Sequence, residues 1–348
     1  MTAAAPVQDA GVERAPTGER WARLIGGGWI FLLLIGLVLV FGIMRPTQFG
    51  SSYNLSMLAV NAAILLVLSV GQTFVIIAAG IDLSVGAVLV FASIASAEVM
   101  LRLSGAAGGT YGSTQGGWSV VAAGLLVALL SGAFWGAVNG ILVAVARVPA
   151  LIVTLGTFGM ALGFAQILTN GVDVRAVPDT LVEGIGSGTV GGIPTLVLIA
   201  AAVAALGAVV LHLTRFGVHV FAVGSDREAA RRAGINVRGR LIAIYTLSGT
   251  LAGLAAMMST ARFATTTIGG HAMDNLATIS AVVLGGTSLF GGIGSIAGTV
   301  VGVFIPIVLL NGFVILGIPP FWQTVATGAV LILAVWIDQL KRRARDRG

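Results

Sequence analysis

The chain has 348 residues, of which 57% are hydrophobic and only 9% are charged, whereas an ordinary soluble domain has about 25% charged residues. So few charges cannot cover a water-exposed surface, and apolar runs recur from residue 25 to residue 337. We therefore predict an all-α, polytopic membrane helix bundle, because these runs are continuous and do not alternate as the strands of membrane barrels do. The net charge of +6 does not indicate nucleic acid, since the basic residues lie at the ends of the apolar runs.

A helix needs about 20 apolar residues to cross a bilayer core about 30 Å thick, and the chain has room for about ten such helices. Residues 1–24 form a polar tail, and the span that follows is too long for the apolar part of a cleaved signal peptide. The membrane domain covers 25–338, and a basic tail follows at 339–348. The predicted spans are 25–44, 55–78, 83–101, 119–145, 150–170, 194–213, 241–260, 275–290, 295–312 and 321–337.

The distribution of Lys and Arg predicts the orientation of these spans. Of the 19 basic residues, 15 fall on one side of the membrane and only 4 on the other when ten spans are threaded in order. Cytoplasmic loops carry an excess of Lys and Arg. Both termini and the basic loop at 214–240 are therefore predicted to be cytoplasmic, and the loops at 103–118 and 171–193 to face outward.

The second and third spans are joined by the sequence GIDLSVG at residues 80–86. Asp82 or Ser84 can accept backbone N–H bonds at the start of the next helix, so one interpretation is a purely structural turn. The other interpretation is functional, because an ionisable residue at membrane depth is costly and usually marks a transport pathway. We expect Asp82 and Ser84 to lie beside such a pathway.

Several uncharged polar residues lie inside the predicted spans. They offer donors and acceptors without fixed charge, which suits the passage of a hydroxylated solute better than that of an ion. Each of them can alternatively serve as an interhelical hydrogen bond. The candidate pathway residues in the spans are Asn61, Gln72, Asn139, Thr154, Thr157 and Gln166.

The loop at 214–240 contains a predicted helix of about two turns. Ser225 or Asp226 can act as its N-cap, Glu228 lies in its first turn, and Gly234 can end it in a left-handed conformation. The helix is too short and too polar to insert, so it either lies on the lipid surface or docks into another protein. Further along, the sequence GGTSLFGGIGSIAG at 285–298 is a second Gly-rich break between apolar segments, and paired broken helices are common in transporters.

Glu228, Ala229, Ala230 and Gly234 match the EAA-x-x-x-G pattern of the cytoplasmic loop in permease subunits of bacterial ABC importers. The Leu-Pro pair that follows in the broader pattern is absent, with Thr246 and Leu247 standing there. Over 31–337 the chain more closely resembles the ribose/xylose/fructose-type monosaccharide permeases. The resemblance lies in VGQTFVIIAAGIDLSVGAV (70–88), VPALIVTLGTFGMALG (148–163), EAARRAGINV (228–237) and ISAVVLGGTSLFGGIGSIAGT (279–299).

This resemblance implies a permease subunit that forms the translocation pathway for a monosaccharide in the bacterial inner membrane. It also implies a second permease copy or close relative, cytoplasmic ATP-binding subunits and a periplasmic sugar-binding protein. Glu228, Ala229, Ala230 and Gly234 would then couple the bundle to the ATPase, with Arg231 and Arg232 meeting acidic rims. The chain has no phosphate loop of the G-x-x-x-x-G-K-[ST] type, so ATP hydrolysis is expected on a separate subunit.

Two other classes of transporter stay open on the sequence. One is an ABC permease for branched-chain amino acids or nucleosides, which shares the broken helices. The other is an ion-driven secondary transporter, for which Asp82 would be the main coupling residue. No enzyme is expected, because no carboxylate pair or His cluster converges within the spans. The absence of Cys and the scatter of the three His residues also lead us to expect no metal site and no cofactor.

Overall fold

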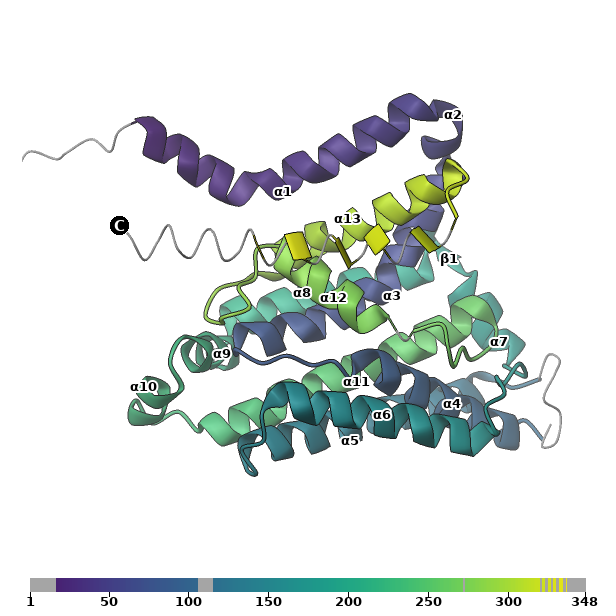
Figure 1. Cartoon of the computed structure of the whole chain (residues 1–348). Helices are drawn as coiled ribbons and strands as arrows, with labels where there is room; N and C mark the ends of the chain where they lie inside the picture. Colours follow the sequence, from purple (N-terminus) through teal and green to yellow (C-terminus); the bar gives the residue numbers. More distant parts are fainter. Residues whose placement is uncertain are drawn as a thin grey trace, which may run out of the picture.

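The computed structural model describes residues 17–105, 115–271 and 273–319, together with separate positions between 321 and 336. Helices dominate the described part of the chain (Figure 1). The elements are α1 (Thr17–Met44), α2 (Pro46–Phe49), α3 (Ser52–Ile77), α4 (Val85–Leu103), α5 (Trp118–Ala144), α6 (Ala150–Thr169), α7 (Asp179–Leu181), the π-helix η1 (Val182–Gly186), β1 (Thr189–Val190), β2 (Ile193–Pro194), α8 (Thr195–Leu213), α9 (Arg215–Ser225), α10 (Arg227–Arg232), α11 (Val237–Phe263), α12 (Asp274–Leu284) and α13 (Ile296–Ile315). The two short strands pair antiparallel.

Seven helices in the described part of the chain are long and apolar enough to cross a membrane: α3, α4, α5, α6, α8, α11 and α13. This agrees with the predicted all-α, polytopic membrane protein. The first predicted span, 25–44, lies within α1. Only separate positions of the last predicted span, 321–337, are described, and residues 1–16 and the C-terminal tail at 339–348 lie outside the described residues.

The predicted span at 275–290 is wrong in its extent. Its helix, α12, has 11 residues and ends at Leu284, so it rises only about 16 Å, roughly half of the hydrocarbon thickness. The helix stops because Gly285 and Gly286 follow, and Gly286 adopts a left-handed conformation with φ at +88°. The chain then runs without regular structure to Ser295, whose side chain caps α13 by accepting from the backbone N–H of Gly298.

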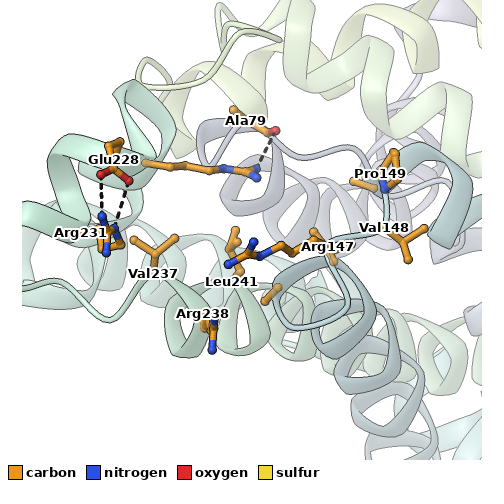
Figure 2. A pocket seen from close by; sticks show the side chains of 13 residues that line it. Ala79, Arg147, Val148, Pro149, Glu228, Arg231, Val237, Arg238 and Leu241 are labelled. Atoms are coloured by element: carbon orange, nitrogen blue, oxygen red, sulfur yellow. Dashed lines mark hydrogen bonds and ion pairs between the residues drawn. The ribbon is translucent and has the colours of Figure 1, made fainter.

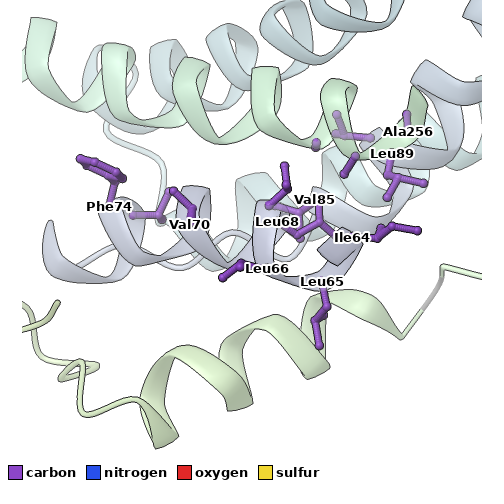
Figure 3. Close-up of a cluster of buried hydrophobic side chains, with 14 of the residues drawn as sticks. Ile64, Leu65, Leu66, Leu68, Val70, Phe74, Val85, Leu89 and Ala256 are labelled. Carbon is purple, nitrogen blue, oxygen red and sulfur yellow. The ribbon is translucent and has the colours of Figure 1, made fainter. Parts of the chain in front are cut away.

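The centre of the bundle is α3, which is buried along most of its length. Figure 3 shows Leu68 and Phe74 of α3 in the same apolar cluster as Leu89 of α4 and Ala256 of α11. Where α5 and α11 cross, small residues allow the two backbones to touch. A Cβ atom added to Gly132 would clash with the carbonyl group of Gly249, so the glycines there allow close helix packing.

Two short helices, α9 and α10, lie at one end of the bundle, whereas α2 and α7 lie at the other (Figure 1). The sequence predicted α10 but not α9. Thr214 begins α9 by accepting from the backbone N–H of Gly217, and Asp226 separates it from α10. The corner between α9 and α10 lies against Ile77, the last residue of α3.

Candidate functional site

The first break in the bundle lies between α3 and α4. After Ile77 the chain turns at Ala79, a non-glycine residue in a left-handed conformation with φ at +55°, which is uncommon. A Cβ atom added to Gly80 would lie 2.7 Å from the hydroxyl oxygen of Tyr245, so only glycine fits beside that ring. Five residues of non-helical chain then precede α4, with Asp82 and Ser84 buried.

Asp82 is the centre of a hydrogen-bonded network inside the bundle. Its Oδ1 atom accepts from the backbone N–H of Ser84 at 2.9 Å and from the Ser84 hydroxyl at 2.6 Å, and its Oδ2 atom accepts from the Ser248 hydroxyl of α11 at 3.4 Å. Asn139 of α5 donates to Ser84 Oγ at 2.8 Å, and Thr157 of α6 donates to Asn139 Oδ1 at 2.7 Å. The network therefore ties the break to three helices.

This geometry differs from simple capping of α4. Ser84 is the N-cap residue, but its side chain makes no capping bond, and the carboxylate of Asp82 accepts from Ser84 itself. Such a buried network is rigid when every member has a partner. Thr154 of α6 adds a weaker tie, because its hydroxyl group lies 3.4 Å from the carbonyl oxygen of Ile81 and also donates within its own helix.

Three of the predicted pathway residues do not join this network. Asn61 and Gln166 are exposed on the outer faces of α3 and α6. Gln72 is buried, and neither polar atom of its side chain has a hydrogen-bond partner among the described residues. Their positions follow from the rotation of each helix about its axis, which is not determined by their presence in an apolar run.

The second break, at 285–295, lies against the first. The backbone N–H of Gly292 donates to the carbonyl oxygen of Ile77 at 2.8 Å. Gly291 packs against Ala79 and Gly224, and a Cβ atom at Gly224 would clash with the same carbonyl group of Ile77. The two breaks therefore meet at the corner between α9 and α10, where the backbones touch without intervening side chains.

The local sequence forms α10 as predicted. The Asp226 side chain accepts from the backbone N–H groups of Glu228 and Ala229 at 2.8 and 3.0 Å. At the other end, Gly234 has φ at +82°, and the backbone N–H of Ile235 donates to the carbonyl oxygen of Ala230. This is the glycine-terminated pattern that ends many helices.

The exposed face of α10 is charged. Glu228 accepts two bonds from Arg231, at 2.6 and 3.0 Å, and a longer one from Arg232 at 3.4 Å. The bonds from Arg231 hold the pKa of the Glu228 carboxyl group below its ordinary value. Ala230 is buried against the bundle, so Ala229 alone of the alanine pair is open to a partner. The small side chain of Ala230 lets α10 lie close to the bundle with one face buried. The expected role of Ala229 and Ala230 in coupling to an ATPase stays a prediction.

A further connection runs from α10 to the first break. Arg227, the first residue of α10, points its Nη2 atom at the carbonyl oxygens of Ala78 and Ala79, at 3.5 and 3.3 Å. The bond to Ala79 is drawn in Figure 2. Sequence analysis missed this residue and also missed Ser248. The position of Arg227 could have indicated its role. A positive charge in the first turn of a helix is unfavourable for the helix dipole, so its presence there suggests a partner elsewhere in the molecule.

Comparison with known proteins places the chain in one family. The family model for the permease component of the branched-chain amino acid transport system matches residues 54–335. The ribose import permease of Escherichia coli strain K12 is 34% identical over 89% of this chain and 93% of its own length. The fructose import permease of Rhizobium meliloti is 33% identical over 90% of this chain and 85% of its own. No solved structure matches. The chain is therefore a membrane protein that belongs to the family of the branched-chain amino acid transport system permease component.

Proposed function

We propose that this chain is the permease subunit of an ATP-binding-cassette importer and forms the pathway for a monosaccharide across the bacterial inner membrane. Similarity to ribose and fructose import permeases over most of the chain supports a sugar as the solute. The proposed complex contains a second permease copy or close relative, cytoplasmic ATP-binding subunits that hydrolyse ATP, and a periplasmic sugar-binding protein. The proposed topology has ten membrane segments with both termini in the cytoplasm.

One observation supports the coupling role of α10 in particular. Arg227 joins the first turn of α10 to the carbonyl groups at the end of α3, and Asp82 lies three residues beyond Ala79. A displacement of α10 by a closing ATPase would therefore pull on the first break and on the network that joins it to α5, α6 and α11. In this mechanism Glu228, Ala229, Arg231, Arg232 and Gly234 form the surface that meets the ATPase.

Within this proposal the pathway residues have two roles. Asp82, Ser84, Asn139 and Thr157 hold the break in register with its neighbouring helices through hydrogen bonds. Gln72, with a buried amide group that has no partner among the described residues, is the residue best placed to bond a hydroxylated solute when the bundle opens. Asn61, Thr154 and Gln166 are assigned lesser roles, because they lie outside the main network.

The family description also names branched-chain amino acids, so an amino acid importer is the second candidate. The two functions are distinguished by reconstituting the chain with its ATPase and binding protein in proteoliposomes. Uptake of labelled ribose, xylose or fructose that requires ATP supports our proposal. Uptake of leucine but of no sugar would replace it, and uptake driven by a proton or sodium gradient without ATP would refute the ATP-driven mechanism.

A further inference from the structure

A cavity of about 850 Å³ lies between α10, the start of α11 and the connection from α5 to α6. Four arginines line it, namely Arg147, Arg227, Arg231 and Arg238, against one acidic residue, Glu228. The lining therefore carries a formal charge of +3. Such a concentration of one sign of charge attracts an anion into the cavity.

Two of these four arginines make no hydrogen bond or ion pair with the described residues. Glu228 is bonded to Arg231, and Arg227 donates to backbone carbonyl groups. Arg147 and Arg238 have no hydrogen bond or ion pair within the described part of the chain. Figure 2 shows Arg147 extending from the α5–α6 connection toward Leu241 of α11. Arg147 also has a left-handed backbone, with φ at +58°, and such conformations persist where the surrounding structure enforces them, often at binding sites.

The surroundings of the cavity are apolar on the side of α5 and α6. Val143 and Val148 belong to its wall. Next to them, large apolar side chains are exposed at the facing ends of the two helices, with 52% of Val145 and 62% of Ile152 accessible. In a membrane protein, exposed apolar side chains at a helix end face lipid. The cavity thus adjoins an acyl-chain environment on one side and a basic helix on the other.

We propose that this cavity binds the phosphate headgroup of an anionic phospholipid, held by the guanidinium groups of Arg147 and Arg238. Guanidinium groups bind phosphate oxygens through two parallel N–H bonds, and basic pockets between membrane helices are suited to anionic lipid headgroups. An acidic protein segment would satisfy the charge but would leave the neighbouring apolar surface unexplained. Because the site is complete in the isolated chain, its test does not depend on the ATPase or on transport.

The test uses the purified full chain, delipidated in a neutral detergent. Phosphatidylglycerol is titrated against phosphatidylcholine with the same acyl chains, and bound lipid is counted by native mass spectrometry. The variants are Arg147→Gln with Arg238→Gln, the same pair changed to Lys, and Arg215→Gln as control. Arg215 is an exposed arginine at the same end of the bundle that does not line the cavity. The thermal melting temperature of each variant without lipid shows whether the fold is retained.

We expect phosphatidylglycerol to bind the wild type at least about tenfold more tightly than phosphatidylcholine, a difference of about 1.4 kcal/mol. The Gln pair should lose this preference, the Lys pair should keep part of it because charge remains without the planar fork, and the control should match the wild type. Equal binding of both lipids, or an unchanged preference in a folded Gln pair, would overturn the proposal.

Two added measurements separate other sources of the anion. If inorganic phosphate at the concentration of the lipid displaces phosphatidylglycerol, the cavity serves a free phosphate compound and the lipid assignment is wrong. If the Gln pair keeps its lipid preference but no longer co-purifies with the ATPase, the arginines meet an acidic protein surface, and this outcome would also overturn the proposal.

Discussion

Replacing Arg227 by methionine removes the bond between α10 and the first break while keeping a long apolar side chain in the first turn. The guanidinium group makes two contacts with carbonyl oxygens, at 3.3 and 3.5 Å. A hydrogen bond from a charged donor contributes about 1.5 to 3 kcal/mol at good geometry. These bonds are long and the residue is exposed, so we assign about 1 kcal/mol to the pair.

An energy of this size should affect transport much more than the stability of the fold. A loss of about 1 kcal/mol is small beside the 5 to 15 kcal/mol of a typical fold, so membrane abundance should stay near that of the wild type. If the first break has two positions in equilibrium, the same energy changes the equilibrium constant between them about fivefold. We therefore expect the amount of solute taken up per ATP hydrolysed to fall about fivefold. ATPase binding should be retained, because Glu228, Ala229 and Arg231 of the proposed docking surface are unchanged.

The assay measures ATP hydrolysis and uptake in the same proteoliposomes. The control is Arg215→Met, which changes an exposed arginine at the start of the neighbouring helix α9, outside the proposed docking surface. A ratio of uptake to hydrolysis that is the same in the Arg227 variant and in the control would refute the connection. Loss of ATPase association in the Arg227 variant would show that this residue belongs to the docking surface instead.

Three further predictions concern the network, the end of α10 and the orientation of the chain. Changing Asp82 to Ala leaves the buried donors of Ser84 and Ser248 without their acceptor, a cost of about 1 to 3 kcal/mol, so uptake should fall more than membrane abundance. A proportional fall in both would make the residue structural only. Changing Gly234 to Val forces a β-branched residue into a left-handed conformation at a cost of about 1 to 2 kcal/mol, which should reduce co-purification of the ATPase without preventing membrane insertion, and unchanged co-purification would contradict the role of α10. In intact cells an impermeant thiol reagent should label a Cys at Ser187 but not one at Ser225, and the reverse pattern would invert the topology.

Local sequence was sufficient for the elements whose cause is local. Apolar runs of about 20 residues predicted the long helices, because a bilayer requires that length of apolar chain. Gly234 and the pair Ser225 and Asp226 predicted the two ends of α10, since capping depends on residues within one turn of each end. The structure has Asp226 as the N-cap. The same reasoning overestimated α12, because hydropathy counts apolar residues and does not register the left-handed turn at Gly286 that stops the helix.

Contacts between distant segments were decided only by the tertiary structure. The polar residues of the spans were identified as a set, but the rotation of each helix sends Asn139 and Thr157 into the network and Gln166 to the outer surface. The bond from Arg227 to Ala79 spans 148 positions of the chain, and no pattern within one segment encodes such a contact. It arises because small residues let the ends of separate helices pack backbone against backbone.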